Sequence, residues 1–142
     1  MKKTLSVSIL LLFVISLFNI NAVTTKKKTV ATVSNTAIIA VYYFHFTRRC
    51  ATCQAVEAES QKAVASLYPA QFKSGKITFK SINLDENDSK TLATKCNVEG
   101  QSLLILSGNK RLDLTEQGFM YARSNPDKLK QALKKAIDPL ID

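Results

Sequence analysis

Residues 37–46 form a nearly uninterrupted apolar run, Ala-Ile-Ile-Ala-Val-Tyr-Tyr-Phe-His-Phe, which is apolar on both alternating faces. A strand with this pattern is buried on both sides, so the run predicts a central strand of a parallel or mixed sheet. A helical pattern follows within a few residues, because residues 51–68 carry one apolar stripe at spacings of three, four and seven. The stripe consists of Cys53, Val56, Ala63, Val64 and Leu67. A buried strand joined to a helix of roughly five turns restricts the chain to layered α/β folds.

Further strands and helices are predicted along the rest of the chain. Strands are expected at residues 29–34, 77–84, 103–106 and 110–115, and helices at residues 89–96 and from Pro126 onward. The turn residues Ser107-Gly108-Asn109 predict a hairpin, and Asn125 before Pro126 predicts a capped helix start. The order strand, strand, helix, strand, helix, two strands, helix indicates a three-layer α/β sandwich.

The first 22 residues have the pattern of a secretory signal peptide. Lys2 and Lys3 precede an apolar run over residues 5–18, and Ala22 offers a small residue for cleavage. The run is shorter than the roughly 18 to 20 residues that span a bilayer, so we rank an uncleaved membrane anchor second. We therefore expect a periplasmic or extracellular protein without stable membrane insertion after cleavage. Residues 23–28 would form an exposed basic leader, and residues 29–142 the folded domain.

Composition limits the class of protein. The 142 residues are 46% hydrophobic and 22% charged, which fits one globular domain with a sizeable core. The formal net charge is +9, but the lysines are spread along the chain without an aromatic-and-basic motif, so we expect a solvated basic face and no nucleic-acid partner. The chain lacks a Gly-rich phosphate loop and a Ser-His-Asp arrangement, and we expect no cofactor.

Cys50 and Cys53 lie between the predicted central strand and the helix that follows it. A Cys-x-x-Cys pair at such a junction favours dithiol chemistry. Export keeps a structural disulfide open as an alternative, because disulfides persist outside the cytoplasm. Against that alternative, three cysteines are too few for a disulfide-stapled scaffold, and a domain of this length does not need staples.

The order of elements resembles that of the thioredoxin superfamily. The likeness covers residues 29–141 and is carried by the Cys-x-x-Cys pair after the second strand, by Phe79-Lys80-Ser81-Ile82-Asn83-Leu84-Asp85-Glu86-Asn87, and by Val98-Glu99-Gly100-Gln101-Ser102-Leu103-Leu104-Ile105-Leu106. The resemblance implies a thioredoxin-like three-layer α/β/α sandwich with a central mixed β-sheet. It also implies exchange with protein thiols or disulfides, and a substrate loop at Gly100, Gln101 and Ser102 that faces the cysteines.

The residues around the pair predict different roles for its two members. Cys50 lies at a helix N-terminus, where the dipole and unpaired backbone N–H groups favour thiolate over thiol, so we expect it to be the nucleophile. Arg48 and Arg49 add positive charge, which lowers the pKa of Cys50 further. Cys53, one turn inward on the apolar stripe, is expected to be the resolving cysteine.

Several positions depart from the thioredoxin pattern near the cysteines. Ala51 and Thr52 replace the usual Gly-Pro, and Arg49 replaces the usual Trp before the first cysteine. Ser102 aligns with the cis-proline of the facing loop. A cis bond before a residue other than proline costs about 2.5 to 4 kcal/mol, so we expect a trans bond there and a loop of different shape.

The proton relay of thioredoxins is also missing. Phe44 aligns with the buried acid, and Ser81 aligns with its lysine neighbour. Two hypotheses follow: an exported thiol–disulfide oxidoreductase with its own redox partner, or a noncatalytic thioredoxin-like interaction module whose Cys50–Cys53 pair is a local structural disulfide. We favour the oxidoreductase.

Two further side chains have alternative interpretations. His45 is either a core imidazole with a satisfied hydrogen bond or a proton carrier near the cysteines. A zinc or copper site made of Cys50, Cys53 and His45 would lack a fourth ligand, so we expect no metal. Cys96 is either a packed, inert thiol or a redox partner, and the packed thiol is the default for a free cysteine.

Overall fold

The computed structural model describes residues 38–141. The predicted signal peptide at 1–22, the leader at 23–28 and the edge strand at 29–34 lie outside the described residues. Between residues 38 and 141, no helix is both long and apolar enough to cross a membrane.

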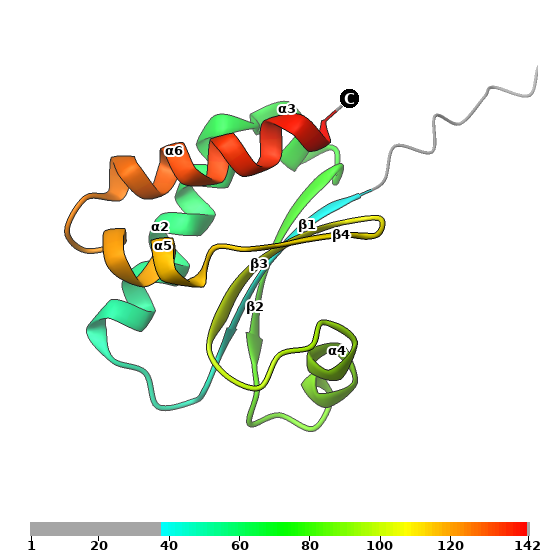
Figure 1. Ribbon diagram of the computed structural model, residues 1–142, viewed down its shortest axis with the longest axis vertical. Helices are drawn as coiled ribbons and strands as arrows, with labels where there is room; N and C mark the ends of the chain where they lie inside the picture. The colour runs from blue at the N-terminus through cyan, green and yellow to red at the C-terminus, as the bar shows by residue number, and fades with distance from the viewer. Residues whose placement is uncertain (1–37, 142) are drawn as a thin grey trace, which may run out of the picture. The chain divides into compact units, whose positions relative to one another are not determined.

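A four-stranded mixed sheet forms the centre of the described domain (Figure 1). Its strands are β1 (Ile39–His45), β2 (Ile77–Asn83), β3 (Ser102–Ser107) and β4 (Lys110–Asp113), in the order β2-β1-β3-β4. β1 is parallel to β2 and antiparallel to β3, and β3 and β4 form an antiparallel hairpin. The predictions of a central strand and of the hairpin are confirmed.

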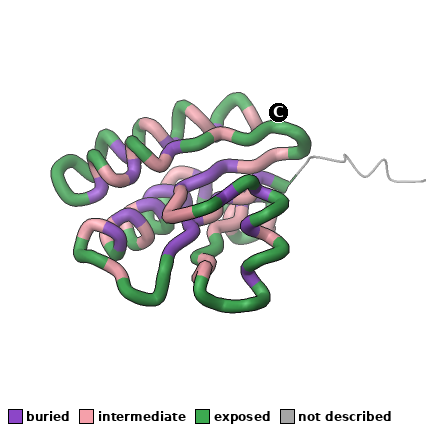
Figure 2. Tube along the Cα trace, turned by 60° about the horizontal axis from the view of Figure 1, so that its bottom comes forward, coloured by how far each residue is buried: buried purple, intermediate pink, exposed green. Residues whose placement is uncertain are grey.

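Helices cover both faces of the sheet. One face carries α2 (Ala51–Leu67), α3 (Pro69–Lys73), α5 (Thr115–Tyr121), α6 (Pro126–Ile137) and the 3₁₀ turn η2 (Asp138–Leu140), and the larger core cluster lies beneath them. The other face carries α4 (Ser89–Lys95) over a smaller cluster around Phe44 and Leu104. Figure 2 shows buried segments along the strands and recurring along the helices. The predicted three-layer sandwich is confirmed.

The helix starts follow from local chemistry. The Cys50 side chain caps α2 by accepting a hydrogen bond from the backbone N–H of Cys53. The Asn125 side chain accepts a hydrogen bond from the Lys128 N–H at 3.1 Å, and Pro126 occupies the first turn of α6. Both helices therefore begin where side-chain oxygen or sulfur satisfies backbone donors that have no partner inside the helix.

Two short helices were missed by the sequence patterns. Pro69 marks the end of α2 but also begins α3, since proline fits the first turn of a helix. Gly118 lies inside α5, where glycine has poor helix propensity. The space around Gly118 explains its place there: an added Cβ would lie 3.1 Å from Val56 Cγ1 and 3.3 Å from Leu103 Cδ2. Close packing of α5 on α2 and β3 therefore takes precedence over helix propensity.

Candidate active site

Cys50 lies at the N-cap of α2, at the end of the loop that leaves β1. Its backbone is extended, with φ −76° and ψ 166°, and its Sγ accepts a hydrogen bond from the Cys53 N–H at 3.3 Å. The thiol is exposed. Hydrogen bonding with the Cys53 side chain, followed by the backbone N–H of Cys53 and then that of Thr52, lowers the pKa of Cys50. The expected helix N-terminus around the first cysteine is present.

Cys53 has the opposite environment, although it lies only one turn along α2. It is 3% exposed and packs on the inner side of the helix. Burial, and next the hydrogen bond with the Cys50 side chain, raise the pKa of Cys53. The pair therefore combines an exposed thiol that ionises readily with a buried thiol that does not, which matches the order of steps that a nucleophile and a resolving cysteine require.

Arg49 forms an ion pair with Glu57, which lies two helical turns into α2. The two side chains are 24% and 25% exposed. Burial opposes ionisation of Glu57, but the Ser81 and Arg49 side chains together outweigh it and lower the pKa of the glutamate. The positive charge of Arg49 is thus shared with a carboxylate. Arg48 is exposed. A pKa-tuning role for the two arginines stays a prediction.

Sequence patterns did not single out Glu57. It lies outside the apolar stripe of residues 51–68, where polar side chains usually face solvent. Its spacing contained a usable signal, because residues four apart on a helix are neighbours and Glu57 follows Cys53 by four. The carboxylate therefore belongs to the surroundings of the cysteine pair.

His45 is buried at the end of β1. Its Nδ1 lies 2.9 Å from the Phe46 carbonyl oxygen, which can only accept, so Nδ1 donates. The ring stacks at a tilt on Tyr43, with centroids 5.8 Å apart. These contacts are those of a core imidazole with a satisfied hydrogen bond. Within residues 38–141, no three His, Cys, Asp or Glu side chains form a group that could hold a metal ion.

The loop with Gly100, Gln101 and Ser102 lies at the same end of the sheet as the cysteines. Ser102 opposes Phe44 across β3 and β1, and the chain continues from β1 directly to Cys50. The Ser102 hydroxyl donates to the Gly100 carbonyl at 3.1 Å. No peptide bond in the described part of the chain is cis, so the predicted trans bond before Ser102 is confirmed. Substrate contact by this loop stays a prediction.

Cys96 is remote from the pair. It is buried at the C-cap of α4, in the smaller core cluster on the opposite face of the sheet from α2. Burial raises the pKa of Cys96. Its carbonyl oxygen accepts a hydrogen bond from Arg111 Nε at 3.0 Å. The structure thus places Cys96 as a packed thiol.

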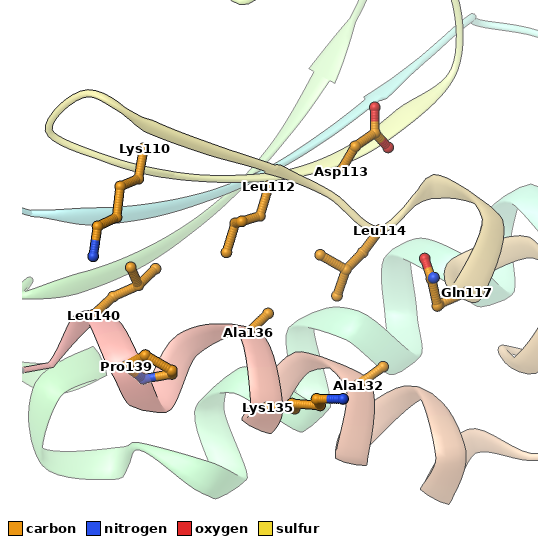
Figure 3. Close-up of a pocket in the computed structure, with 10 residues that line it drawn as sticks. All are labelled: Lys110, Leu112, Asp113, Leu114, Gln117, Ala132, Lys135, Ala136, Pro139 and Leu140. Carbon is orange, nitrogen blue, oxygen red and sulfur yellow. The ribbon is translucent and has the colours of Figure 1, made fainter.

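A groove of about 620 Å³ lies elsewhere, between β4 and the α6–η2 segment (Figure 3). Its apolar lining includes Leu112, Leu114 and Leu140, and Lys110 and Lys135 also border it. None of its lining residues belongs to the cysteine site, so this groove does not contribute to the chemistry of the pair.

Among known proteins, the chain is similar to solved structures only. No protein-family model and no curated protein matches the chain. The chain is similar to oxidised thioredoxin O2 from Arabidopsis thaliana, with 17% identity over 75% of this chain and 77% of that one and a TM-score of 0.49. It is also similar to a thioredoxin from Trypanosoma brucei brucei, with 22% identity over 72% of this chain and 77% of that one and a TM-score of 0.44.

The molecule has a thioredoxin-like α/β fold with a Cys-x-x-Cys pair at a helix N-terminus. The sheet order, the helices on both faces and the position of Cys50 and Cys53 define this class.

Removing the partner of Arg49 tests whether this arginine acts on Cys50. In Glu57→Gln the charge of Arg49 is no longer balanced, so we expect the pKa of Cys50 to fall and its alkylation by iodoacetamide at pH 7 to rise. The expected rise is roughly two- to fivefold, because interactions between partly exposed charges amount to less than about 1 kcal/mol. The double variant Arg49→Met/Glu57→Gln is the control, and its rate of Cys50 alkylation should not show this rise. An alkylation rate in Glu57→Gln equal to wild type would contradict tuning by Arg49.

Proposed function

We propose that the protein is an exported thiol–disulfide oxidoreductase that acts on the thiols or disulfides of other proteins. The observation that carries the proposal is the asymmetry of the pair. Cys50 is exposed with a lowered pKa, and Cys53 is buried with a raised pKa. A purely structural disulfide has no need of an exposed thiol stabilised as thiolate.

The asymmetry supports a two-step exchange. The Cys50 thiolate attacks a substrate disulfide, forms a mixed disulfide and releases one substrate thiolate. Cys53 then loses its proton and attacks Cys50 Sγ, which releases the second substrate thiolate and leaves a Cys50–Cys53 disulfide. Two electrons pass from the protein to the substrate. In the reverse direction the protein oxidises a substrate dithiol, and its reduction potential relative to the partner sets the direction.

Export of the protein is part of the proposal and rests on the sequence. The basic start at Lys2 and Lys3, the apolar run over residues 5–18 and the small residue Ala22 fit a cleaved signal peptide. Protein disulfides persist in the periplasm and outside the cell, so substrates of this chemistry are available there. The partner that restores the pair after each cycle would be a second dithiol or disulfide protein of the same compartment.

Substitution of the resolving cysteine tests the proposed function. Cys53→Ser leaves Cys50 able to form mixed disulfides but removes the thiol that resolves them, so we expect client proteins to accumulate as adducts that reductant releases. Cys50→Ser should give no adducts, and Cys96→Ser should behave as wild type because Cys96 lies on the other face of the sheet. The adducts are counted on nonreducing gels and identified by mass spectrometry.

The noncatalytic module predicts a different result. It gives no adducts with any variant, no reduction of insulin disulfides, and a Cys50 pKa near the ordinary value of about 8.5. Such a result would overturn the oxidoreductase proposal.

A further inference from the structure

Strand β4 forms one edge of the sheet, because the strand order in the described part of the chain is β2-β1-β3-β4. On its inner side it pairs with β3, where Leu112 lies opposite Ile105. Along an antiparallel pair, residues that bond to the neighbouring strand alternate with residues whose backbone groups point away from it. The outer side of β4 therefore offers backbone donors and acceptors that none of the described strands uses.

The alternation identifies the residues that carry these free backbone groups. The Leu114 N–H donates to the Leu103 carbonyl oxygen at 2.8 Å, so Leu114 is one of the residues that bond to β3. Asp113 and Arg111 lie one and three residues before Leu114. Their N–H and C=O groups therefore point outward, where an additional strand would meet them.

The groove between β4 and the α6–η2 segment, here called the β4–α6 groove, is lined by this edge strand. Its volume of about 620 Å³ lies within the range of ligand-binding pockets. Leu112 and Leu114 line it from the sheet and Leu140 lines it from η2 (Figure 3). A strand added to β4 would place every second side chain on the groove's face of the sheet. An open edge beside a groove for alternate side chains is the arrangement by which sheets bind extended peptides.

Gln117 contributes an unused hydrogen-bond acceptor to the β4–α6 groove. Its Oε1 is buried and has no hydrogen-bond partner among residues 38–141. Figure 3 shows Gln117 beside Leu114 at one end of the groove, with Lys110 and Leu140 at the other. A buried acceptor without a partner costs free energy, which an N–H donor of a bound ligand would recover.

The charges around the β4–α6 groove favour an acidic ligand. Lys110 and Lys135 border the groove, both are exposed, and neither forms an ion pair with another described residue. Asp113, the acidic residue of the lining, is already bound by the Arg111 side chain at 3.4 Å and by the Thr115 hydroxyl at 2.6 Å. The two lysines are thus available for carboxylates of a ligand.

These features distinguish between three kinds of occupant. An anionic amphiphile would match the apolar lining and the lysines, but it would leave the backbone of Arg111 and Asp113 and the Gln117 acceptor unused. The chain's own N-terminal stretch contains three consecutive lysines at positions 26–28, the same charge as the groove. An extended segment of another protein, with apolar and acidic side chains, matches the edge, the lining, the acceptor and the charge.

We propose that the edge of β4 and the β4–α6 groove form a docking site for an extended acidic and apolar segment of a partner protein, which pairs with Arg111 and Asp113 as an added strand. The inference goes beyond the proposed oxidoreductase and does not depend on it. No lining residue of the groove belongs to the cysteine site, so a docked segment leaves Cys50 accessible.

A model peptide tests the proposed docking site. The probe is a blocked peptide of sequence Glu-Thr-Val-Thr-Val-Thr-Glu, which as a strand places its valines and glutamates on one face. It is added to the ¹⁵N-labelled full chain, and amide hydrogen exchange is followed by NMR. At saturation we expect the Arg111 and Asp113 amides to exchange at least about tenfold more slowly, because each gains a hydrogen bond. The Leu112 amide, which already bonds to β3, should not change.

Substitutions at the groove should weaken peptide binding, measured by titration of the amide shifts. Lys110→Glu/Lys135→Glu is expected to lower the affinity about tenfold, because two exposed ion pairs are lost. Gln117→Met, which removes the acceptor, should lower it about fivefold. Lys130→Glu is the matched control, because Lys130 lies on α6 outside the β4–α6 groove, and it should bind as wild type. Cys50→Ser should also bind as wild type, so failure of the proposed function leaves this result unchanged.

Four outcomes would overturn the docking site. Equal binding of the same peptide with methylated backbone nitrogens would exclude an added strand. Slow exchange of the Arg111 and Asp113 amides before peptide is added would mean that the chain itself or a second copy covers the edge. Shifts at the groove with laurate but not with the peptide would indicate an anionic amphiphile. No shift with either probe would show that Lys110 and Lys135 only protect the sheet edge against aggregation.

Discussion

Cys50→Ser is expected to abolish thiol–disulfide exchange, with the rate of insulin reduction falling by roughly three orders of magnitude or more, as when an enzyme loses its nucleophile. Cys50 is the exposed member of the pair, and the hydrogen bonds at the N-cap of α2 lower its pKa. A serine hydroxyl at this position is not ionised near neutral pH and cannot replace the thiolate. Cys53 cannot take over, because it is buried and its pKa is raised.

The pH dependence of alkylation tests the difference in pKa between Cys50 and Cys53, and it requires no knowledge of the substrate. In Cys53→Ser the backbone N–H groups of residues 52 and 53 remain, and the serine hydroxyl can donate in place of the Cys53 thiol, so we expect Cys50 to react with iodoacetamide below the ordinary thiol value of about 8.5. A raised pKa means that Cys53 in Cys50→Ser reacts only above that value. Cys96→Ser is the control for insulin reduction and should retain wild-type activity. Equal midpoints for the two cysteines, or full activity in Cys50→Ser, would contradict the assigned nucleophile.

The central strand and the helix after it could be predicted because both patterns extend over many residues. Ten residues that are apolar on both faces are compatible with few structures other than a buried strand, and β1 lies between β2 and β3 as expected. The cysteine pair could be predicted from its position at the junction of the two elements. Its chemistry follows from the helix N-terminus, a local feature that a sequence determines directly.

The partners of the pair could not be predicted in the same way, because they depend on how separate elements pack. Tyr43 is one aromatic residue among several on β1, and only the packing of α2 against the sheet buries it in the larger core cluster. Glu57 lies on the polar side of its helix in the sequence pattern, and only the folded structure shows that it pairs with Arg49. α5 was missed because glycine has poor helix propensity. Gly118 is present in this helix because α5 packs closely on Val56 of α2 and Leu103 of β3.

Leu103→Ala is expected to lower the free energy of unfolding by roughly 2 to 5 kcal/mol, as for other buried leucines. Leu103 is fully buried in the larger core cluster, at the start of β3, and its side chain lies against Gly118. The truncation leaves a cavity between α5 and the sheet. Urea unfolding followed by circular dichroism measures the loss.

Gly118→Ala should partly refill that cavity. In the wild-type background the new Cβ would lie 3.1 Å from Val56 Cγ1 and 3.3 Å from Leu103 Cδ2, so crowding offsets the gain in helix propensity. In the Leu103→Ala background the Leu103 contact is absent, and the same methyl group fills space. We therefore expect the double variant to be more stable than the sum of the single changes by about 1 kcal/mol, a typical coupling between residues in contact.

Gly100→Ala provides the matched control for this cycle, because a Cβ at Gly100 meets no atom within 4 Å. Combined with Leu103→Ala it should show additive free energies of unfolding. Additive energies for Leu103 and Gly118 would instead mean that α5 shifts away from the sheet to accommodate either change. That outcome would contradict a close-packed contact among Gly118, Val56 and Leu103. Because Val56 lies one turn beyond Cys53, the same contact also holds the Cys53 end of α2 against the sheet.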